Sequence, residues 1–270
     1  MKIDMHIHSN YSDGSLSPQE IVDVALKNKV SYISLTDHDT IDGISDFKTA
    51  SKLKNIKITP GVEISTKYKR THILGYNFLD LKTMKQELDK YAKQNHNICL
   101  KIIYDMKEDG IFISRYALKT ISGDRYLTLK TLAKALVFEG IVKTEVEAFE
   151  KYLSYNKLYY YDLIKMSTKE AIKLITECGG IPVLAHPYYS FFKDLSYEIN
   201  ELILKGIKGI EVYYGLHNLE QKEFLRRVAI EKNLIMTIGS DFHKFNGKGR
   251  NIGLEMDYNT FYNSQLNKIY

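Results

Sequence analysis

The sequence contains seven short segments in which apolar residues dominate or alternate with polar ones, a pattern typical of β-strands. Helical patterns separate several of these segments. Two of the helices have clear start signals, because Ser17 can form a capping box with Glu20 and Ser167 with Glu170. Such alternation predicts an α/β protein with a mostly parallel sheet, either a barrel or an open doubly wound sheet. The predicted strands span residues 2–8, 32–36, 56–64, 72–78, 181–185, 209–214 and 234–239.

One long region interrupts the alternation. Residues 80–164 have apolar side chains at helical spacing and are predicted to be helical throughout. We therefore predict one domain formed by residues 1–79 and 165–270, with residues 80–164 as a helical insertion. Several tyrosines near its end either pack the insertion against the rest of the protein or form part of a lid over a substrate, because long insertions are often functional. They are Tyr152, Tyr155, Tyr159, Tyr160 and Tyr161.

The composition is that of an ordinary globular protein. Apolar residues make up 44% of the 270 residues and charged residues 26%, which excludes a disordered chain or a disulfide scaffold. The net charge of +5 is too small to indicate binding to duplex DNA, although it leaves small anionic substrates open. Cys99 and Cys178 form no C-x-x-C pair and are expected to be free thiols in a reducing compartment. Without a signal-peptide core or a long apolar stretch, the protein is expected to be cytoplasmic and to bind no membrane.

Six of the eight histidines are expected at or just beyond the carboxyl ends of predicted strands. Chance placement would scatter them. On the first strand, His6 and His8 share one face, because side chains two residues apart point the same way. An H-x-H pair of this kind can hold a metal ion. The six histidines are His6, His8, His38, His72, His186 and His243.

Carboxylates accompany these histidines. Asp13 follows the first strand, Glu63 ends another, and Asp241 lies two residues before His243. In an α/β barrel the loops that follow the strands converge at one end and build the active site there. Burying such a cluster without cations would carry a large desolvation penalty, so bound ions are expected. Histidine and carboxylate ligands without cysteine favour manganese, iron or zinc, and nine candidate ligands require two or three ions.

The order of motifs resembles the polymerase and histidinol phosphatase (PHP) family of metal-dependent phosphoesterases. The motifs read H-x-H, S-D-G, T-D-H-D, G-x-E-x-S, H-I-L-G-Y, A-H-P and G-S-D-F-H. They follow one another over nearly the whole chain. The resemblance implies a distorted (β/α)7 TIM-like barrel with a trinuclear metal site. The matching stretches are residues 5–14, 35–42, 61–65, 72–76, 184–187 and 239–243.

The same resemblance, carried over residue by residue, implies nine metal ligands. It implies that Glu63 bridges ions, that Asp241 joins the H-x-H pair, and that His72 and His186 complete the third ion. Three of the ligands, Asp13, His38 and His243, are also predicted to be catalytic. The full set is His6, His8, Asp13, His38, Glu63, His72, His186, Asp241 and His243.

Within the family, the single-domain phosphatases of nucleoside 5′-monophosphates or 3′,5′-bisphosphates look most similar, and some of these also trim short RNA from the 5′ end. The similarity lies in residues 131–149. It implies hydrolysis of a phosphate monoester, above all of a nucleotide, by water that the metals activate. No side-chain nucleophile is expected, since G-x-S-x-G is absent from the sequence. The alternatives are a histidinol-phosphate phosphatase, a 5′-3′ exoribonuclease acting on short RNA, or an inactive PHP binding module.

One stretch departs from that branch of the family. The branch typically carries G-R-P-H where this chain reads T-L-K-T at residues 128–131, so the usual arginine and histidine are missing. Arg125 lies a few residues upstream and is predicted to contact the substrate instead. After His243, a basic glycine-rich segment provides Lys244 and Arg250 as further predicted anion contacts, unless it is a solvated surface turn.

For several other polar residues near the motifs, two roles are possible. His217 follows a strand and resembles a family histidine near the substrate, so it either contacts substrate or caps a helix. Asp37 and Asp39 flank His38 and either orient ligands or have a capping or surface role. His96 lies alone in the insertion and is predicted to be a surface residue.

Overall fold

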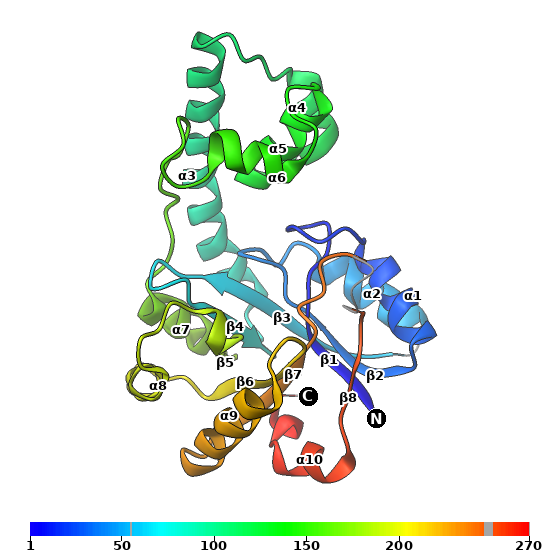
Figure 1. Ribbon diagram of the computed structural model, residues 1–270. Coiled ribbons are helices and arrows are strands. Elements are labelled where there is room, and N and C mark those ends of the chain that lie inside the picture. The colour runs from blue at the N-terminus through cyan, green and yellow to red at the C-terminus, as the bar shows by residue number, and fades with distance from the viewer. Residues whose placement is uncertain (55, 246–250, 270) are drawn as a thin grey trace. The chain divides into compact units, whose positions relative to one another are not determined.

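In the computed structural model, an eight-stranded sheet forms the centre of the larger part of the chain (Figure 1). The structure describes residues 1–54, 56–245 and 251–269. The strand order is β7-β6-β5-β4-β3-β2-β1-β8. All seven predicted strands are present, and one further strand follows them. Their bounds are β1 (Lys2–Ile7), β2 (Val30–Leu35), β3 (Lys57–Ser65), β4 (His72–Tyr76), β5 (Ile181–Leu184), β6 (Gly209–Tyr214), β7 (Ile235–Gly239) and β8 (Leu254–Glu255).

The sheet curls until its first strand meets the segment that follows β7. His8 N donates to the Phe242 carbonyl oxygen over 2.9 Å, and Asp241 N donates to the His6 carbonyl oxygen over 2.9 Å. Near the start of β1, β8 pairs with it in antiparallel fashion. The result is a nearly closed barrel, which confirms the predicted barrel over the open sheet.

The sheet is mostly parallel, as predicted, but strand β4 runs antiparallel to both of its neighbours. A short turn, closed by a 3.0 Å bond from Thr66 N to the Thr71 carbonyl oxygen, joins β3 to β4 without a helix. So short a connection only permits antiparallel pairing. The prediction that His72 lies at a carboxyl end is therefore wrong, because His72 is the first residue of β4. Reversal of the strand places this amino end beside the carboxyl ends of its neighbours.

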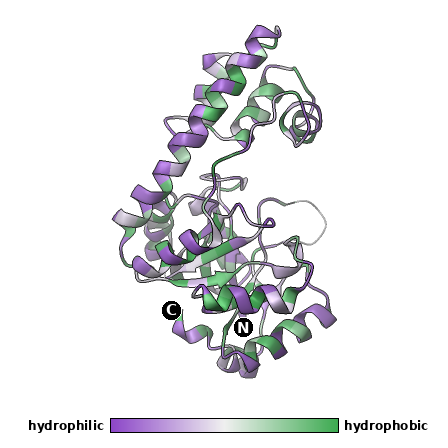
Figure 2. Cartoon of the chain, turned by 90° about the vertical axis from the view of Figure 1, so that its left-hand side faces the viewer, coloured by the Kyte–Doolittle hydropathy of each residue, from purple (hydrophilic) through white to green (hydrophobic). Residues whose placement is uncertain are grey.

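Helices of the larger unit, among them α1, α2, α7 and α9, pack against the strands of the barrel. The predicted capping boxes of Ser17 with Glu20 and of Ser167 with Glu170 are both confirmed. Figure 2 shows helices banded with hydrophobic and hydrophilic residues around largely hydrophobic strands. The helices are α1 (Pro18–Lys27), α2 (Ile44–Lys54), α3 (Leu81–Glu108), α4 (Arg115–Ser122), α5 (Leu129–Phe138), α6 (Glu145–Ala148), α7 (Thr168–Glu177), α8 (Leu195–Leu204), α9 (Leu219–Glu231) and α10 (Tyr258–Asn263), with η1 (Phe149–Leu153), a π-helical turn, and the 3₁₀ turns η2 (Pro187–Tyr189) and η3 (Leu266–Lys268).

The chain divides into two compact units, one formed by residues 1–88 and 166–270 and the other by residues 89–165. The second unit has its own core, in which Leu132 and Leu136 of α5 pack with Ile102 of α3. Its last part, residues 154–165, is irregular rather than helical, which corrects the expectation of a helical pattern throughout. In that part Tyr159 is buried and its hydroxyl donates to Asp109 over 2.7 Å. No helix in the described part of the chain is both long and apolar enough to cross a membrane.

Candidate metal centre

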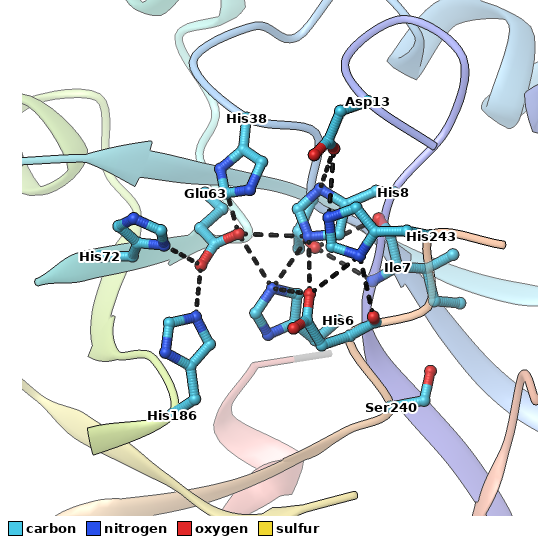
Figure 3. A network of polar contacts seen from close by, with 12 residues as sticks. His6, Ile7, His8, Asp13, His38, Glu63, His72, His186, Ser240 and His243 are labelled. Carbon is cyan, nitrogen blue, oxygen red and sulfur yellow. Dashed lines mark hydrogen bonds and ion pairs between the residues drawn. The ribbon is translucent and has the colours of Figure 1, made fainter. Parts of the chain in front are cut away.

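Histidines and carboxylates from distant parts of the larger unit converge at one end of the barrel (Figure 3). β1 supplies His6 and, just past its end, His8, while β3 supplies Glu63 from within the strand. The remaining members lie in the segments that follow strands, except for His72 at the start of β4. The structure thus brings together all nine predicted ligands: His6, His8, Asp13, His38, Glu63, His72, His186, Asp241 and His243.

Glu63 lies at the middle of this arrangement and is fully buried. Its Oε1 is 2.9 Å from His72 Nδ1 and 2.9 Å from His186 Nε2. Its Oε2 is 3.1 Å from His6 Nε2 and 3.2 Å from His8 Nε2. Each carboxylate oxygen therefore faces a different group of imidazoles, as a carboxylate that bridges two ions would.

Asp241 is a second carboxylate that faces the H-x-H pair. Its Oδ1 is 3.2 Å from His8 Nε2 and 3.6 Å from His6 Nε2, and Tyr214 OH donates to its Oδ2 over 2.9 Å. The backbone φ of Asp241 is +53° and that of His186 is +23°. Left-handed conformations in residues other than glycine cost of the order of 1–3 kcal/mol and gather at functional sites.

Asp13 forms a third group with three histidines, His8, His38 and His243, and is itself partly exposed. Its Oδ1 is 3.1 Å from His243 Nε2. The loop that carries it is held by Asp37, which is buried and accepts from Ser9 N over 2.7 Å. Gly14 in this loop has no room for a side chain, since a Cβ there would lie 2.2 Å from the His8 carbonyl oxygen.

The donor atoms fit divalent transition metals. Three sets each place one ligand atom per residue within 4.8 Å of the others. In addition, the buried atoms His8 Nδ1 and His186 Nδ1 have no hydrogen-bond partner among the described residues, an arrangement that is costly unless something else satisfies them. Imidazole and carboxylate donors without thiolate suit manganese, iron or zinc. The three sets are His8, Asp13, His38 and His243; His6, His8, Glu63 and Asp241; and His38, Glu63 and His72.

The imidazoles and carboxylates of the cluster shift one another's pKa values. Burial by itself lowers the pKa of His8, but its contacts with Asp241 and Glu63 outweigh burial and raise the pKa to about 10. Burial would raise the pKa of Glu63, whereas the neighbouring His38, His6 and His72 lower it well below its usual range. Burial also lowers the pKa of His38 to about 3. The carboxylates are therefore ionised at neutral pH, and His8 carries a proton until a cation replaces it.

This coupling predicts that affinity for Mn²⁺ rises with pH between about 6 and 8. A raised pKa of about 10 means that His8 keeps its proton throughout that range, and the ion can bind its nitrogen only when this proton leaves. Each displaced proton should strengthen binding about tenfold per pH unit. Calorimetric titration in two buffers of different ionisation enthalpy would count the protons released. An affinity that is constant across this range, with no proton release, would contradict the expectation.

The structure also gives roles to polar residues beside the ligands. Asp39 accepts from Ser65 N over 2.8 Å and so fixes the end of β3, while Asp37 holds the Asp13 loop. Glu211 of β6 was not predicted as a site residue, although it is fully buried and its Oε1 is 2.9 Å from His6 Nδ1. An acidic residue inside the otherwise apolar run of residues 209–214 was the signal that could have found it.

The predicted substrate contacts are more dispersed. His217 is buried and its Nδ1 lies 3.2 Å from the Val212 carbonyl oxygen, while Asn218, not His217, caps α9. Lys244 is exposed beside His243. Arg125 belongs to the smaller unit, where its Nε donates to the Ser122 carbonyl oxygen over 3.2 Å. Arg250 lies outside the described residues.

The remaining notable residues of the smaller unit have structural roles. Thr128 caps α5 through a capping box with Thr131, and Lys130 Nζ lies 2.8 Å from Glu145 Oε2. His96 is only partly exposed, and its Nδ1 accepts from Leu127 N over 3.0 Å, so the prediction of a plain surface residue is wrong. The stretch that departs from G-R-P-H therefore serves to start a helix.

Comparison with known proteins gives consistent results. A family model described as the PHP domain matches residues 4–212. A 5′-3′ exoribonuclease of Haemophilus influenzae is 33% identical over 246 residues, which cover 90% of this chain and 90% of the relative. A 3′,5′-nucleoside bisphosphate phosphatase of Chromobacterium violaceum is 30% identical over 266 residues, which cover 93% of this chain and 90% of the relative.

A solved structure has the same fold. The crystal structure of a protein from Bifidobacterium adolescentis, classed with the metal-dependent phosphoesterases, superposes with a TM-score of 0.81. The alignment covers 96% of this chain and 94% of that chain at 24% identity. The likeness supports the barrel with its interrupting helical segment as the common architecture.

Proposed function

This chain belongs to the PHP domain family, and we propose that it removes the terminal phosphate of a nucleotide, either a nucleoside 5′-monophosphate or a 3′,5′-bisphosphate. It is a metal-dependent phosphoesterase. The finer assignment to nucleotides is our proposal. It extends to the metals, for which we propose manganese, iron or zinc, and to a cytoplasmic location.

The observation that carries the proposal is the three adjoining ligand sets at one end of the barrel. Divalent ions bound there would lower the pKa of a water molecule and neutralise the charge of a phosphoryl group. The side chains have the complementary tasks. Glu63 keeps two groups of imidazoles at fixed separation, and Asp13, His38 and His243 form the most accessible face, where the phosphate would enter.

Recognition of a nucleoside is supported by the relatives and by a groove in the larger unit that includes two aromatic residues in a mainly polar lining. The groove has a volume of about 790 Å³, and its lining includes Tyr188, Phe224 and Arg227. Tyr188 is two residues from His186, and its ring centroid is 5.5 Å from that of His217. Aromatic faces stack on bases without regard to sequence, so this surface suits the nucleoside part of a substrate.

The test is turnover across a panel of phosphate esters with added Mn²⁺. We expect nucleoside 5′-monophosphates or 3′,5′-bisphosphates to have a higher kcat/KM than histidinol phosphate by about tenfold or more, an effect of about 1.4 kcal/mol in transition-state binding. The panel should be repeated with a generic aryl phosphate as the control for the metal chemistry alone. Equal kcat/KM for all monoesters would contradict nucleotide recognition, and turnover of histidinol phosphate alone would support that alternative.

A 5′-3′ exoribonuclease acting on short RNA is the second candidate, because the Haemophilus influenzae relative with that name is 33% identical over 90% of this chain. Short 5′-phosphorylated RNA belongs in the same panel. Faster release of mononucleotides from RNA than of phosphate from mononucleotides would establish this candidate over the first. Absence of turnover for every substrate, with metal bound, would support the inactive binding module.

A further inference from the structure

Glu211 makes two hydrogen bonds that connect the H-x-H pair to the histidine after β5. Its Oε1 lies 2.9 Å from His6 Nδ1, and its Oε2 accepts from the backbone N–H of His186 over 2.8 Å. All three residues are buried, and Glu211 has no exposed surface. One carboxylate on β6 therefore joins a residue of β1 to a residue that follows β5.

The bond to His6 decides which of its ring nitrogens faces the ligand cluster. An ionised carboxylate only accepts hydrogen bonds, so Nδ1 must carry the hydrogen. Nε2 is then the nitrogen that faces the ligand cluster, 3.1 Å from Glu63 Oε2, and a bound ion would take its lone pair in place of the hydrogen bond to Glu63. A histidine that ligates a metal through one nitrogen is usually fixed in this way through the other.

Only a carboxylate satisfies both neighbours. Both groups that face Glu211 are N–H donors, and each is bonded to a different oxygen. A glutamine at this position has one oxygen and one NH₂ group, so it would place a donor against a donor at either His6 or His186. Glutamine is therefore a disruptive replacement here despite its matching size.

The facing strand leaves space for this contact. A Cβ built on Gly239 of β7 would lie 2.3 Å from His6 Cβ and 2.6 Å from Glu211 Oε1. Atoms cannot approach so closely, so a side chain at residue 239 would push His6 and Glu211 apart. Gly239 is thus a second, independent feature that serves the same pair.

We propose that Glu211 is a positioning residue that fixes His6 Nε2 as a metal-binding nitrogen and anchors His186, with Gly239 providing the space for their contact. The proposal deepens the assignment of the ligand cluster and rests on the proposed function. Glu211 acts through His6 and His186, and both of its oxygens are already engaged with their N–H groups.

The experiment compares metal binding by the wild-type protein and Glu211→Gln, with Mn²⁺ alone as the probe and free Mn²⁺ counted by electron paramagnetic resonance. We expect affinity for the ion that His6 binds to fall about 10- to 100-fold, the usual cost of losing an outer-shell partner. An ion that His186 binds should weaken with it, whereas the ion that His8, Asp13, His38 and His243 would hold should bind as in the wild type, because Glu211 bonds to none of these residues. After loading with Co²⁺ instead, the visible spectrum of the variant should differ, because the orientation of one ligand has changed.

Glu198→Gln is the matched control. Glu198 is also a buried carboxylate of the larger unit, bonded to Tyr68 and Lys69 rather than to a predicted ligand. We expect this variant to lose thermal stability without losing metal affinity. If Glu211→Gln bound Mn²⁺ like the wild type, or changed only the melting temperature as the control does, the positioning role would be overturned.

Gly239→Ala tests the same contact with the carboxylate retained, and it decides the matter if Glu211→Gln does not fold. We expect the same weakening of the ion that His6 binds, and we expect the double variant to lose less affinity than the two single variants combined, since both changes disturb one contact. Unchanged Mn²⁺ binding by Gly239→Ala would overturn the steric part of the proposal. A wild-type protein that binds no Mn²⁺ would instead refute the metal centre itself.

Discussion

Replacement of Glu63 by glutamine is expected to reduce turnover by about 1,000-fold or more, which exceeds the 10- to 100-fold cost of losing an outer-shell partner. Both oxygens of Glu63 face imidazoles, with His72 and His186 on one and His6 and His8 on the other. Glutamine removes the negative charge and one acceptor oxygen, so two adjacent ions lose a shared ligand. The measurement is kcat with Mn²⁺, together with the number of bound ions.

The fold of this variant must be checked separately, since Glu63 is fully buried. Circular dichroism and the melting temperature, measured before metal is added, would show whether the barrel is intact. Glu198→Gln again serves as the control with comparable burial. A folded Glu63→Gln protein that retained wild-type turnover would exclude Glu63 as a bridging ligand.

The second large effect concerns Asp13→Ala, which should lower turnover by about 100-fold or more and remove one bound ion. Asp13 lies at the same end of the barrel, where its side chain is 32% exposed and contacts His243. The buried set with His6 and Glu63 does not contain it, so those residues should keep their ion. Metal analysis after gel filtration would give the number of ions that stay bound to each protein molecule.

Asp42→Ala is the matched control for Asp13→Ala. The Asp42 side chain is 34% exposed, belongs to the same unit and pairs with Lys85 rather than with a predicted ligand. Its loss should leave both turnover and metal content unchanged. If the two variants behaved alike, Asp13 would be a surface carboxylate and the third ligand set would be refuted.

The barrel could be predicted because its signals are local. Each of the seven predicted strands is a short segment rich in apolar residues. Ser17 and Ser167 mark helix starts through hydrogen bonds to residues three positions further along the chain. The direction of β4 was missed because strand patterns do not encode direction, and only the length of the turn at residues 66–71 does. Strand β8 has two residues, which is too few for a periodic pattern.

The members of the candidate site could be predicted for a different reason. Their motifs are contiguous in sequence and resemble those of the PHP family, so each residue could be carried over without knowledge of its neighbours. Glu211 lacked such a motif, and its role depends on His6, a residue 205 positions away. Contacts at such separation depend on the closure of the barrel, which no local pattern describes.

Closure of the barrel also sets when the centre can come into existence. Asp4 accepts from Ser240 N over 3.0 Å across 236 residues, and Asp241 reaches the H-x-H pair only through this junction. Closing a loop of that length costs of the order of 5 kcal/mol in chain entropy. During synthesis, His6 and His8 leave the ribosome early, whereas Asp241 follows only after nearly the whole chain has been made. A chain that stops before Gly239 therefore lacks both the contacts that close the barrel and the carboxylate that faces the H-x-H pair.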